Sequence, residues 1–432
     1  MKRTLPVLAV LAVACADSSK PAPSPPEPVS VDGQWIERFS KTGRFAFGEP
    51  RAPAFTRDGS AVLFLQSEPA SAEQRLHRLD LSSGKVGEIL SAADLLGEGT
   101  RETLSDEELA MRERTRSSAR GLAQFIRSHD GSFLVLPLSG RLFRYDLDPE
   151  ADPPVTEINL GSGGPVLTPK LSPNDRHIAF VRDGALHVYD FDGRRTRRIV
   201  SARENGTTVG LAEFVAQEEM ERRDGFWWSP DSRFIAFQRT DERDVTVLTR
   251  TSLSNPTASP IDQRYPRPGE NNARVSLETV SVWGGSTTNV DWDKERFPYL
   301  TRVVWSENAP LTVVVQDRPQ TNLVVLTADE RGRTLELHRE SHPAWVNLDP
   351  SVPHWLPDGQ AFLWSTERDG DWQLELRSAD GELSRVLVPV NTGYRRLHGV
   401  DQGGAVAVVD VGRDPREQYV ARVDLASGAV SR

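Results

Sequence analysis

Cysteines, long apolar runs and an excess of positive charge are all missing from this sequence of 432 residues. The single cysteine excludes an intramolecular disulfide and a zinc site built from several cysteines. Beyond the first 15 residues, no run approaches the roughly 20 apolar residues that a membrane-spanning helix needs. Acidic residues outnumber basic residues by 62 to 52, and the net charge of −10 argues against nucleic acid as a partner. No glycine-rich phosphate loop follows a strand pattern, so we predict no cofactor.

A metal site is not predicted either. His338 and His342 have the four-residue spacing of two zinc ligands on a helix. However, Glu340 is misplaced for the H-E-x-x-H motif, and Pro343 follows directly, which argues against a helix at this point.

The residues that are present suit a globular protein with many turns. Apolar residues make up 38% of the chain and include 16 Phe and 10 Trp, enough to fill a sizeable core. The 32 glycines and 30 prolines are spread along the chain. This distribution predicts many turns and few long helices.

The N-terminus has the pattern of an export signal. Residues 1–15, MKRTLPVLAVLAVAC, combine two basic residues, an apolar run and the only cysteine. The small residues before Cys15 resemble a bacterial lipoprotein processing site, which predicts that Cys15 is lipidated; an ordinary signal peptide cleaved near Ala16 is the alternative. Residues 16–28 are rich in Pro and Ser and suit a tether, so we expect the folded body to span residues 29–432. The expected location is the bacterial cell envelope, as a membrane-anchored lipoprotein that is periplasmic or surface-exposed.

A repeated unit of polar turn and apolar strands fills the body. The intervals between successive turns are 72, 44, 57, 76, 51 and 44 residues. Four-stranded propeller blades take about 40 to 50 residues, so the pattern predicts an all-β protein, a β-propeller, in which a further blade can lie within a long interval. A pair of β-sandwiches is the alternative. The seven turns are centred at Asp58, Asp130, Asn174, Asp231, Glu307, Asp358 and Gln402.

Two segments interrupt this strand pattern. Residues 92–120 contain LSDEELAMRERTR, which predicts a charged helix with Ser105 as its cap and Glu108 three residues later. Residues 211–223, LAEFVAQEEMERR, form a short amphipathic run. Insertions in a propeller decorate a face or the central channel, so we expect the functional site in these segments.

The second segment contains two neighbouring carboxylates, Glu218 and Glu219. Two adjacent acids repel each other unless a cation lies between them, and a peptide α-ammonium group is one such cation. The simpler interpretation is a pair of helix-surface ion pairs, Glu218 with Arg222 and Glu219 with Arg223, worth a few tenths of a kcal/mol each. Spacing alone leaves both interpretations open.

Several separated motifs resemble the dipeptidyl peptidase IV family of the prolyl oligopeptidase superfamily. The acid pair is followed by Trp227-Trp228-Ser229-Pro230, as in that family, and the likeness continues in QRYPRPGENNARVSL, WVNL and WSTERDGDWQLEL. These motifs occur in the family order and extend from about residue 34 to residue 432. The resemblance implies an eight-bladed propeller that caps an α/β-hydrolase domain.

The resemblance also implies roles for individual residues. In the family, the two glutamates hold the free amino terminus of the substrate, so that cleavage follows the second residue, usually proline or alanine. Glu218 and Glu219 match these glutamates. An arginine of the propeller binds the substrate carbonyl; Arg116 falls at that position, with Arg114 and Arg120 close enough to compete. The alternative role for Arg116 is an exposed helix charge paired with a nearby acid.

The catalytic half of such a peptidase is not found in the sequence. A nucleophile elbow G-x-S-x-G is absent, so no Ser-His-Asp site is nominated. The expected function is therefore that of a non-catalytic domain for substrate recognition, and its partners would be a peptide with a free N-terminus (X-Pro or X-Ala) and a separate α/β-hydrolase chain. A stand-alone peptide-binding lipoprotein and a truncated, inactive product are the alternatives. Exposure of Trp35, Ile36 and Phe39 would indicate a surface that a partner normally covers.

Overall fold

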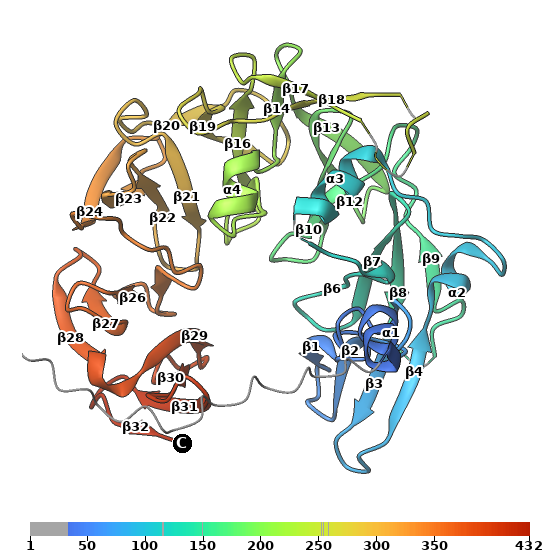
Figure 1. The fold of residues 1–432 in the computed structure, drawn as a ribbon, viewed down its shortest axis with the longest axis horizontal. Coiled ribbons are helices and arrows are strands. Elements are labelled where there is room, and N and C mark those ends of the chain that lie inside the picture. The colour runs from blue at the N-terminus through green and yellow to red at the C-terminus, as the bar shows by residue number, and fades with distance from the viewer. Residues whose placement is uncertain (1–32, 115, 149, 252, 254, 258) are drawn as a thin grey trace, which may run out of the picture.

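The computed structural model describes residues 33–114, 116–148, 150–251, 253, 255–257 and 259–432. The predicted leader, the lipidation site Cys15 and the tether lie outside these residues and stay predictions. Within the described part, strands dominate and form sheets that stand around a central opening (Figure 1). This arrangement is a β-propeller and excludes the pair of β-sandwiches.

Seven sheets of four or five strands make up the propeller within the described residues, and nearly every strand pairing is antiparallel. The exception is β5, which runs parallel to β3. The first sheet comprises β1 Arg51–Phe55, β2 Ala61–Ser67, β3 Glu73–Asp80, β4 Val86–Leu90 and β5 Arg120–Gly121. The second comprises β6 Ile126–Arg127, β7 Phe133–Leu138, β8 Arg141–Asp146 and β9 Val155–Glu157. The third comprises β10 Leu167–Leu171, β11 His177–Arg182, β12 Ala185–Asp190 and β13 Arg195–Ser201.

The remaining sheets follow in chain order. The fourth comprises β14 Thr207–Val209, β15 Phe226–Trp228, β16 Phe234–Asp241, β19 Arg274–Ser281 and β20 Thr288–Val290. The fifth comprises β21 Tyr299–Val304, β22 Leu311–Gln316, β23 Asn322–Ala328 and β24 Thr334–Ser341. The sixth comprises β25 His354–Trp355, β26 Ala361–Thr366, β27 Gln373–Ser378 and β28 Leu383–Val388. The seventh comprises β29 Tyr394–Val400, β30 Val406–Val411, β31 Tyr419–Asp424 and β32 Val430–Ser431.

The elements outside these sheets are short. A separate two-stranded hairpin joins β17 Val247–Arg250 to β18 Ile261–Arg264. The helices are α1 Gly33–Lys41, α2 Ala92–Leu96, α3 Asp106–Arg114, α4 Phe214–Glu219 and the 3-10 turn η1 Val390–Thr392. None of the described helices is long and apolar enough to cross a bilayer.

The prediction of eight blades is wrong for the described residues, which contain seven. The two longest turn intervals do not hold another blade. The 72-residue interval contains α2 and α3, and the 76-residue interval contains the β17–β18 hairpin. Turn spacing alone cannot separate a blade from an insertion, because both lengthen the interval.

The predicted turns fold as the sequence suggests. In the fourth sheet, the Asp231 carboxylate accepts hydrogen bonds from the Ser229 hydroxyl at 2.6 Å and from the Arg233 N–H at 3.0 Å. The Ser229 hydroxyl accepts the Phe234 N–H at 2.8 Å. Short polar side chains thus satisfy the backbone where the chain reverses between strands.

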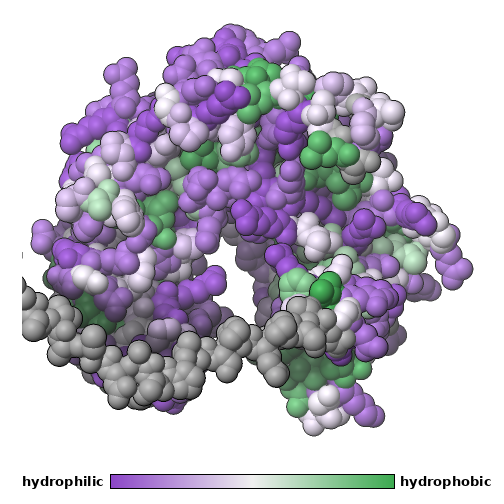
Figure 2. Space-filling model, viewed as in Figure 1, coloured by the Kyte–Doolittle hydropathy of each residue, from purple (hydrophilic) through white to green (hydrophobic). Residues whose placement is uncertain are grey.

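The hydrophobic core is a series of clusters between neighbouring sheets. Separate clusters join the first sheet to the second, the second to the third, the third to the fourth and the fourth to the fifth. A further cluster joins the fifth, sixth and seventh sheets. No cluster of described residues joins the seventh sheet to the first, and Figure 1 shows these two sheets apart at the ends of an open ring. Figure 2 shows the central opening that the ring surrounds.

The N-terminal helix α1 buries none of its residues. Trp35 stacks on Phe39 with ring centroids 5.1 Å apart, and Phe45 packs edge-on against both rings. Trp35 and Ile36 remain 46% and 53% exposed, as predicted, whereas Phe39 is half-buried.

Candidate functional site

Helix α4 belongs to a loop that interrupts one edge of the fourth sheet. The strands before and after the loop pair with the same neighbouring strand. β14 and β15 both pair with β16, and residues 210–225 form the excursion between them. At its neck, Leu211 and Asp224 form an antiparallel bridge. A Cβ atom at Gly225 would lie 2.3 Å from the Leu211 nitrogen, so only glycine permits this close approach.

One face of α4 anchors the loop. Ala216 and Met220, one helical turn apart, are buried with Ala212 and pack against Tyr299 and Leu348. Tyr299 begins β21, so the helix rests on the fifth sheet although it belongs to the fourth. Figure 1 shows α4 inside the ring, with α3 near it in the same half of the ring.

The two glutamates lie at the C-terminal end of α4. Glu218 is half-buried and Glu219 is exposed. Neither carboxylate makes a hydrogen bond or an ion pair with any residue that the structure describes. Glu218 lies two residues from the buried Ala216, on the opposite face of the helix from the anchor. The pair therefore presents two unneutralised charges from a helix that lies inside the ring.

The simpler interpretation of the pair, as helix-surface ion pairs with Arg222 and Arg223, is not what forms. The helix ends at Glu219, and Glu221 adopts a left-handed backbone conformation with φ of 50°. The regular four-residue spacing is lost there, so Arg222 turns into the protein and Arg223 lies exposed without an ion-pair partner among the described residues.

Arg222 is buried against Glu213, the residue that caps the start of α4. The Arg222 Nη2 atom lies 3.5 Å from the Glu213 Oε1 atom, and both side chains are almost fully buried. Glu213 Oε2 accepts the Ala216 N–H at 2.9 Å. Burial opposes charge on both partners: it lowers the pKa of Arg222 to about 10 and raises the pKa of Glu213, although the Arg222 guanidinium partly offsets the latter.

Of the three candidate arginines, Arg114 is the one that contacts α4. Its guanidinium lies 5.3 Å from the centre of the Phe214 ring, and its Nη1 atom lies 3.5 Å from the Gln217 Oε1 atom. Arg116 is exposed and has φ of 50°, and its N–H donates to the Glu113 carbonyl at 3.0 Å. Arg120 belongs to β5 on the first sheet.

A cavity of about 440 Å³ lies between α3, α4 and the inner strand β10. Gln217 lines it from α4, and Met111 and Arg112 line it from α3. Lys170 enters from β10; its Nζ lies 2.8 Å from the Asp224 carboxylate, and burial lowers its pKa. Neither Glu218 nor Glu219 lines this cavity, which reaches α4 at Gln217 and has the size of a small-ligand site.

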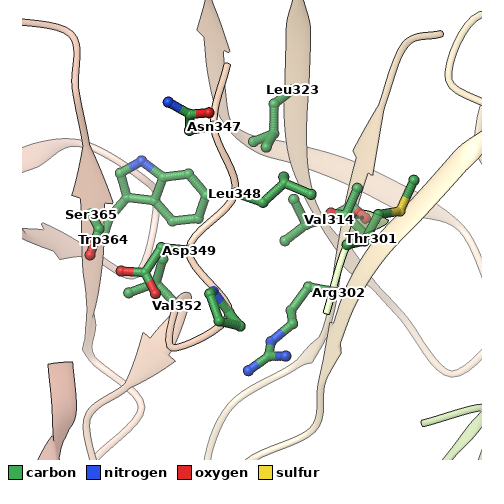
Figure 3. A pocket seen from close by; sticks show the side chains of 12 residues that line it. Thr301, Arg302, Val314, Leu323, Asn347, Leu348, Asp349, Val352, Trp364 and Ser365 are labelled. Atoms are coloured by element: carbon green, nitrogen blue, oxygen red, sulfur yellow. Dashed lines mark hydrogen bonds between the residues drawn. The ribbon is translucent and has the colours of Figure 1, made fainter. Parts of the chain in front are cut away.

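A smaller cavity of about 20 Å³ lies beneath α4, between the fifth and sixth sheets, and Met220 is one of its lining residues. Figure 3 shows Arg302, Asp349 and Trp364 around this space. Burial lowers the pKa of Arg302, and the nearby Asp224 and Asp349 carboxylates oppose that shift. The cavity is too small for a peptide and marks where α4 is anchored.

Sequence reasoning did not nominate Glu213 and Arg222 as a pair. A signal was present, because Glu213 lies near the start of the amphipathic run, at the position that caps α4. The pairing itself depends on the chain reversal at Glu221, which spacing rules do not capture. No group of His, Cys, Asp and Glu side chains in the described part of the chain could hold a metal ion.

The fold and the inserted helix define a β-propeller with an interior polar site. The chain belongs to the family described as the dipeptidyl peptidase IV (DPP IV) N-terminal region, whose model matches residues 128–430. This membership confirms the resemblance inferred from the motifs and fits a peptidase-related role.

Individual relatives agree with this assignment. Dipeptidyl peptidase 8 of Mus musculus is 28% identical over 324 residues, which cover 61% of this chain and 36% of the mouse protein. Dipeptidyl-aminopeptidase B of Aspergillus niger is 24% identical over 280 residues, covering 60% of this chain and 29% of the fungal protein. The chain thus spans about a third of the length of these relatives.

The crystal structure of Porphyromonas gingivalis dipeptidyl peptidase 4 shares the fold. Its TM-score is 0.71 at 21% sequence identity, and the match covers 93% of this chain and 55% of that one. At this level of identity the similarity establishes the fold, and the function of the site has to be argued from its residues.

Proposed function

We propose that this chain is the substrate-recognition propeller of a dipeptidyl peptidase IV-like serine peptidase, in which Glu218 and Glu219 bind the free amino terminus of a peptide. The observation that carries the proposal is the absence of any partner for the two carboxylates among the described residues. An α-ammonium group has three donors and one positive charge, which matches two adjacent acceptors.

The surroundings of the pair support the proposal. The 440 Å³ cavity lies next to Gln217, one residue before the pair, and can accept the residues that follow the amino terminus. Arg116 is proposed to bind a substrate carbonyl; Arg114, which contacts α4, is its rival for that role. The reaction itself would require a serine nucleophile from an α/β-hydrolase unit, for which the present sequence has no G-x-S-x-G motif.

The test compares a peptide beginning Ala-Pro with its N-acetylated form, by calorimetry at pH 7. Wild type is expected to bind the free-amine peptide more tightly. The double substitution Glu218→Gln with Glu219→Gln is expected to lower the affinity for the free-amine peptide at least about tenfold. Affinity for the free-amine peptide should also fall above about pH 8, because the α-amino group then loses its proton.

The matched control is Asp106→Asn with Glu107→Gln, which removes an adjacent acid pair from α3, the helix near α4 in the same half of the ring. This variant should keep wild-type affinity. Arg116→Ala should weaken the binding of both peptides equally, since N-acetylation leaves the substrate carbonyl unchanged. Equal affinity of wild type for the two peptide forms would refute the proposed function.

A further inference from the structure

The segment that carries the glutamates is too short to be stable by itself. Helix α4 has six residues, and isolated helices shorter than about 12 residues are marginal in water. Its conformation must therefore come from contacts that the loop makes with itself and with the neighbouring sheet. The buried side chains of Glu213 and Arg222 supply polar contacts at both ends of the helix.

Arg222 connects three separate pieces of backbone. Its Nε donates to the Leu300 carbonyl of β21 at 2.9 Å, and its Nη1 donates to the Asp224 carbonyl at the neck at 2.6 Å. Its own N–H donates to the Ala216 carbonyl at 3.0 Å. The side chain thus ties the loop to the fifth sheet and to its own neck, and the backbone N–H of the same residue closes the end of α4.

Glu213 fixes the opposite end. Its carboxylate caps α4 through the Ala216 N–H, and its carbonyl accepts the Gln217 N–H at 3.2 Å. Because Glu213 also faces Arg222, the start and the end of the helix are held by one buried ion pair.

The pair also decides which acid Arg222 contacts. Arg222 follows Glu218 by four residues, the spacing at which a continuous helix would bring the two side chains together. Its burial against Glu213 directs the guanidinium away from Glu218, which keeps its charge available. A released Arg222 could neutralise Glu218 and weaken any cation site there.

Stability gives a weak reason for such a pair. Burying two charges costs about as much as their attraction returns, and apolar replacements are often neutral or stabilising. Moreover, the Arg222 Nη2 atom has no hydrogen-bond partner among the described residues. The buried Glu213–Arg222 pair is better explained as a device that selects one conformation of the loop.

We propose that Glu213 and Arg222 are positioning residues, which hold α4 in the conformation that leaves Glu218 and Glu219 free to bind an amino terminus. This inference rests on the proposed function for the effect on binding. The ordering of α4 by the ion pair can be measured separately.

The test variant is Glu213→Gln with Arg222→Met, because a single substitution would leave the other charge buried and unpaired. Hydrogen exchange of residues 211–225 is expected to accelerate at least tenfold, while the other sheets keep wild-type rates. The free-amine advantage, defined as the affinity for the free-amine Ala-Pro peptide divided by the affinity for its N-acetylated form, should fall at least fivefold. The affinity for the acetylated form should not change.

The matched control removes another buried Arg–Glu pair, Arg377 and Glu375 of β27, whose Nη2 and Oε2 atoms lie 2.6 Å apart. Glu375→Gln with Arg377→Met should change neither the exchange of residues 211–225 nor the free-amine advantage. If this control lost the advantage equally, the effect would be general destabilisation and positioning would be refuted.

Two further outcomes overturn the inference. Unchanged exchange in the Glu213→Gln, Arg222→Met variant would show that the pair does not order α4. Faster exchange with a full free-amine advantage would show that the ordering is not needed for binding. Failure of the proposed function is a separate result. It would be seen as equal affinity of the wild type for the two peptide forms, or as unchanged binding by the Glu218→Gln, Glu219→Gln variant, and neither measurement uses hydrogen exchange.

Discussion

The aspartates of the blade turns show how single residues stabilise the repeated unit. Asp130 accepts hydrogen bonds from the hydroxyl of Ser132 at 2.7 Å and from its N–H at 2.9 Å. These bonds favour the ionised carboxylate and lower the pKa of Asp130 to about 2. Hydrogen bonds from nearby Thr and Ser side chains also lower the pKa values of Asp58 and Asp80 to about 2, so the property belongs to several turns.

A pH dependence of stability follows at this scale. A carboxyl group with a lowered folded-state pKa contributes stability above its usual value near 3.9, and that contribution is lost as the pH falls toward 2. Asp130 is exposed, so solvent screening limits its share to about 1 kcal/mol or less. Urea denaturation at pH 6 should show Asp130→Asn as less stable than wild type, and the difference should shrink at pH 2.5.

The control for this measurement is Asp106→Asn, because the Asp106 side chain accepts no hydrogen bond from the described residues. It should show a smaller difference at pH 6. An Asp130→Asn deficit that persisted at pH 2.5 would mean that the charge of the aspartate is not the cause.

Residue-level prediction from the sequence succeeded for the turns and was incomplete at the site. The motif S-P-D-S specified the hydrogen bonds around Asp231, because all partners lie within five residues. The partner of Arg222 was missed, since spacing favoured Glu218 on a continuous helix. The backbone reversal at Glu221 depends on packing against the fifth sheet, which no local pattern encodes.

Between elements, tryptophan side chains connect neighbouring sheets. Trp228 of the fourth sheet donates its Nε1–H to the Lys170 carbonyl of the third at 3.1 Å. Trp355 of the sixth sheet donates to the Thr312 hydroxyl of the fifth at 2.9 Å, and Trp364 donates to the Glu340 carboxylate at 2.8 Å. Each indole combines buried apolar area with one directed polar contact.

The Trp355–Thr312 contact predicts a measurable coupling between sheets. Trp355→Phe and Thr312→Val each remove one partner, and both residues are buried. A double-mutant cycle by urea denaturation should give an interaction energy of about 1 kcal/mol, because the second substitution removes a bond already broken. Thr240, a buried threonine on the fourth sheet, provides the control: Thr240→Val should be additive with Trp355→Phe. Additivity in the Thr312 cycle would show that the contact contributes no net stability.

At the level of elements, the sequence predicted what local patterns control. A capped helix was expected within residues 92–120, and the structure has one at Asp106–Arg114, which Ser105 caps by accepting the Glu108 N–H at 3.1 Å. The sequence did not reveal that β14 and β15 occupy one strand position, since strand pairing with β16 is non-local. The count of seven sheets was missed for the same reason.

Across the whole molecule, burial differs between the middle and the end of the ring. In the third sheet, every residue of β11 is buried, so both faces of that strand are covered. In the seventh sheet, β31 alternates: Ala421 and Val423 are buried, whereas Val420 is 63% exposed and Arg422 is also exposed. This period of two means that β31 is covered on one face only.

Stability should therefore decrease toward the seventh sheet. In an array whose units contact only their neighbours, each unit is stabilised by its own contacts plus those of its interfaces, so an end unit with one interface opens more easily. β30 and β11 are both second strands paired on each side, which makes their amides a matched comparison. Native-state hydrogen exchange should be at least about tenfold faster for residues 406–411 than for residues 177–182. Equal protection would contradict the one-sided packing and would mean that the outer face of the seventh sheet is covered in solution or that the ring opens as one cooperative unit.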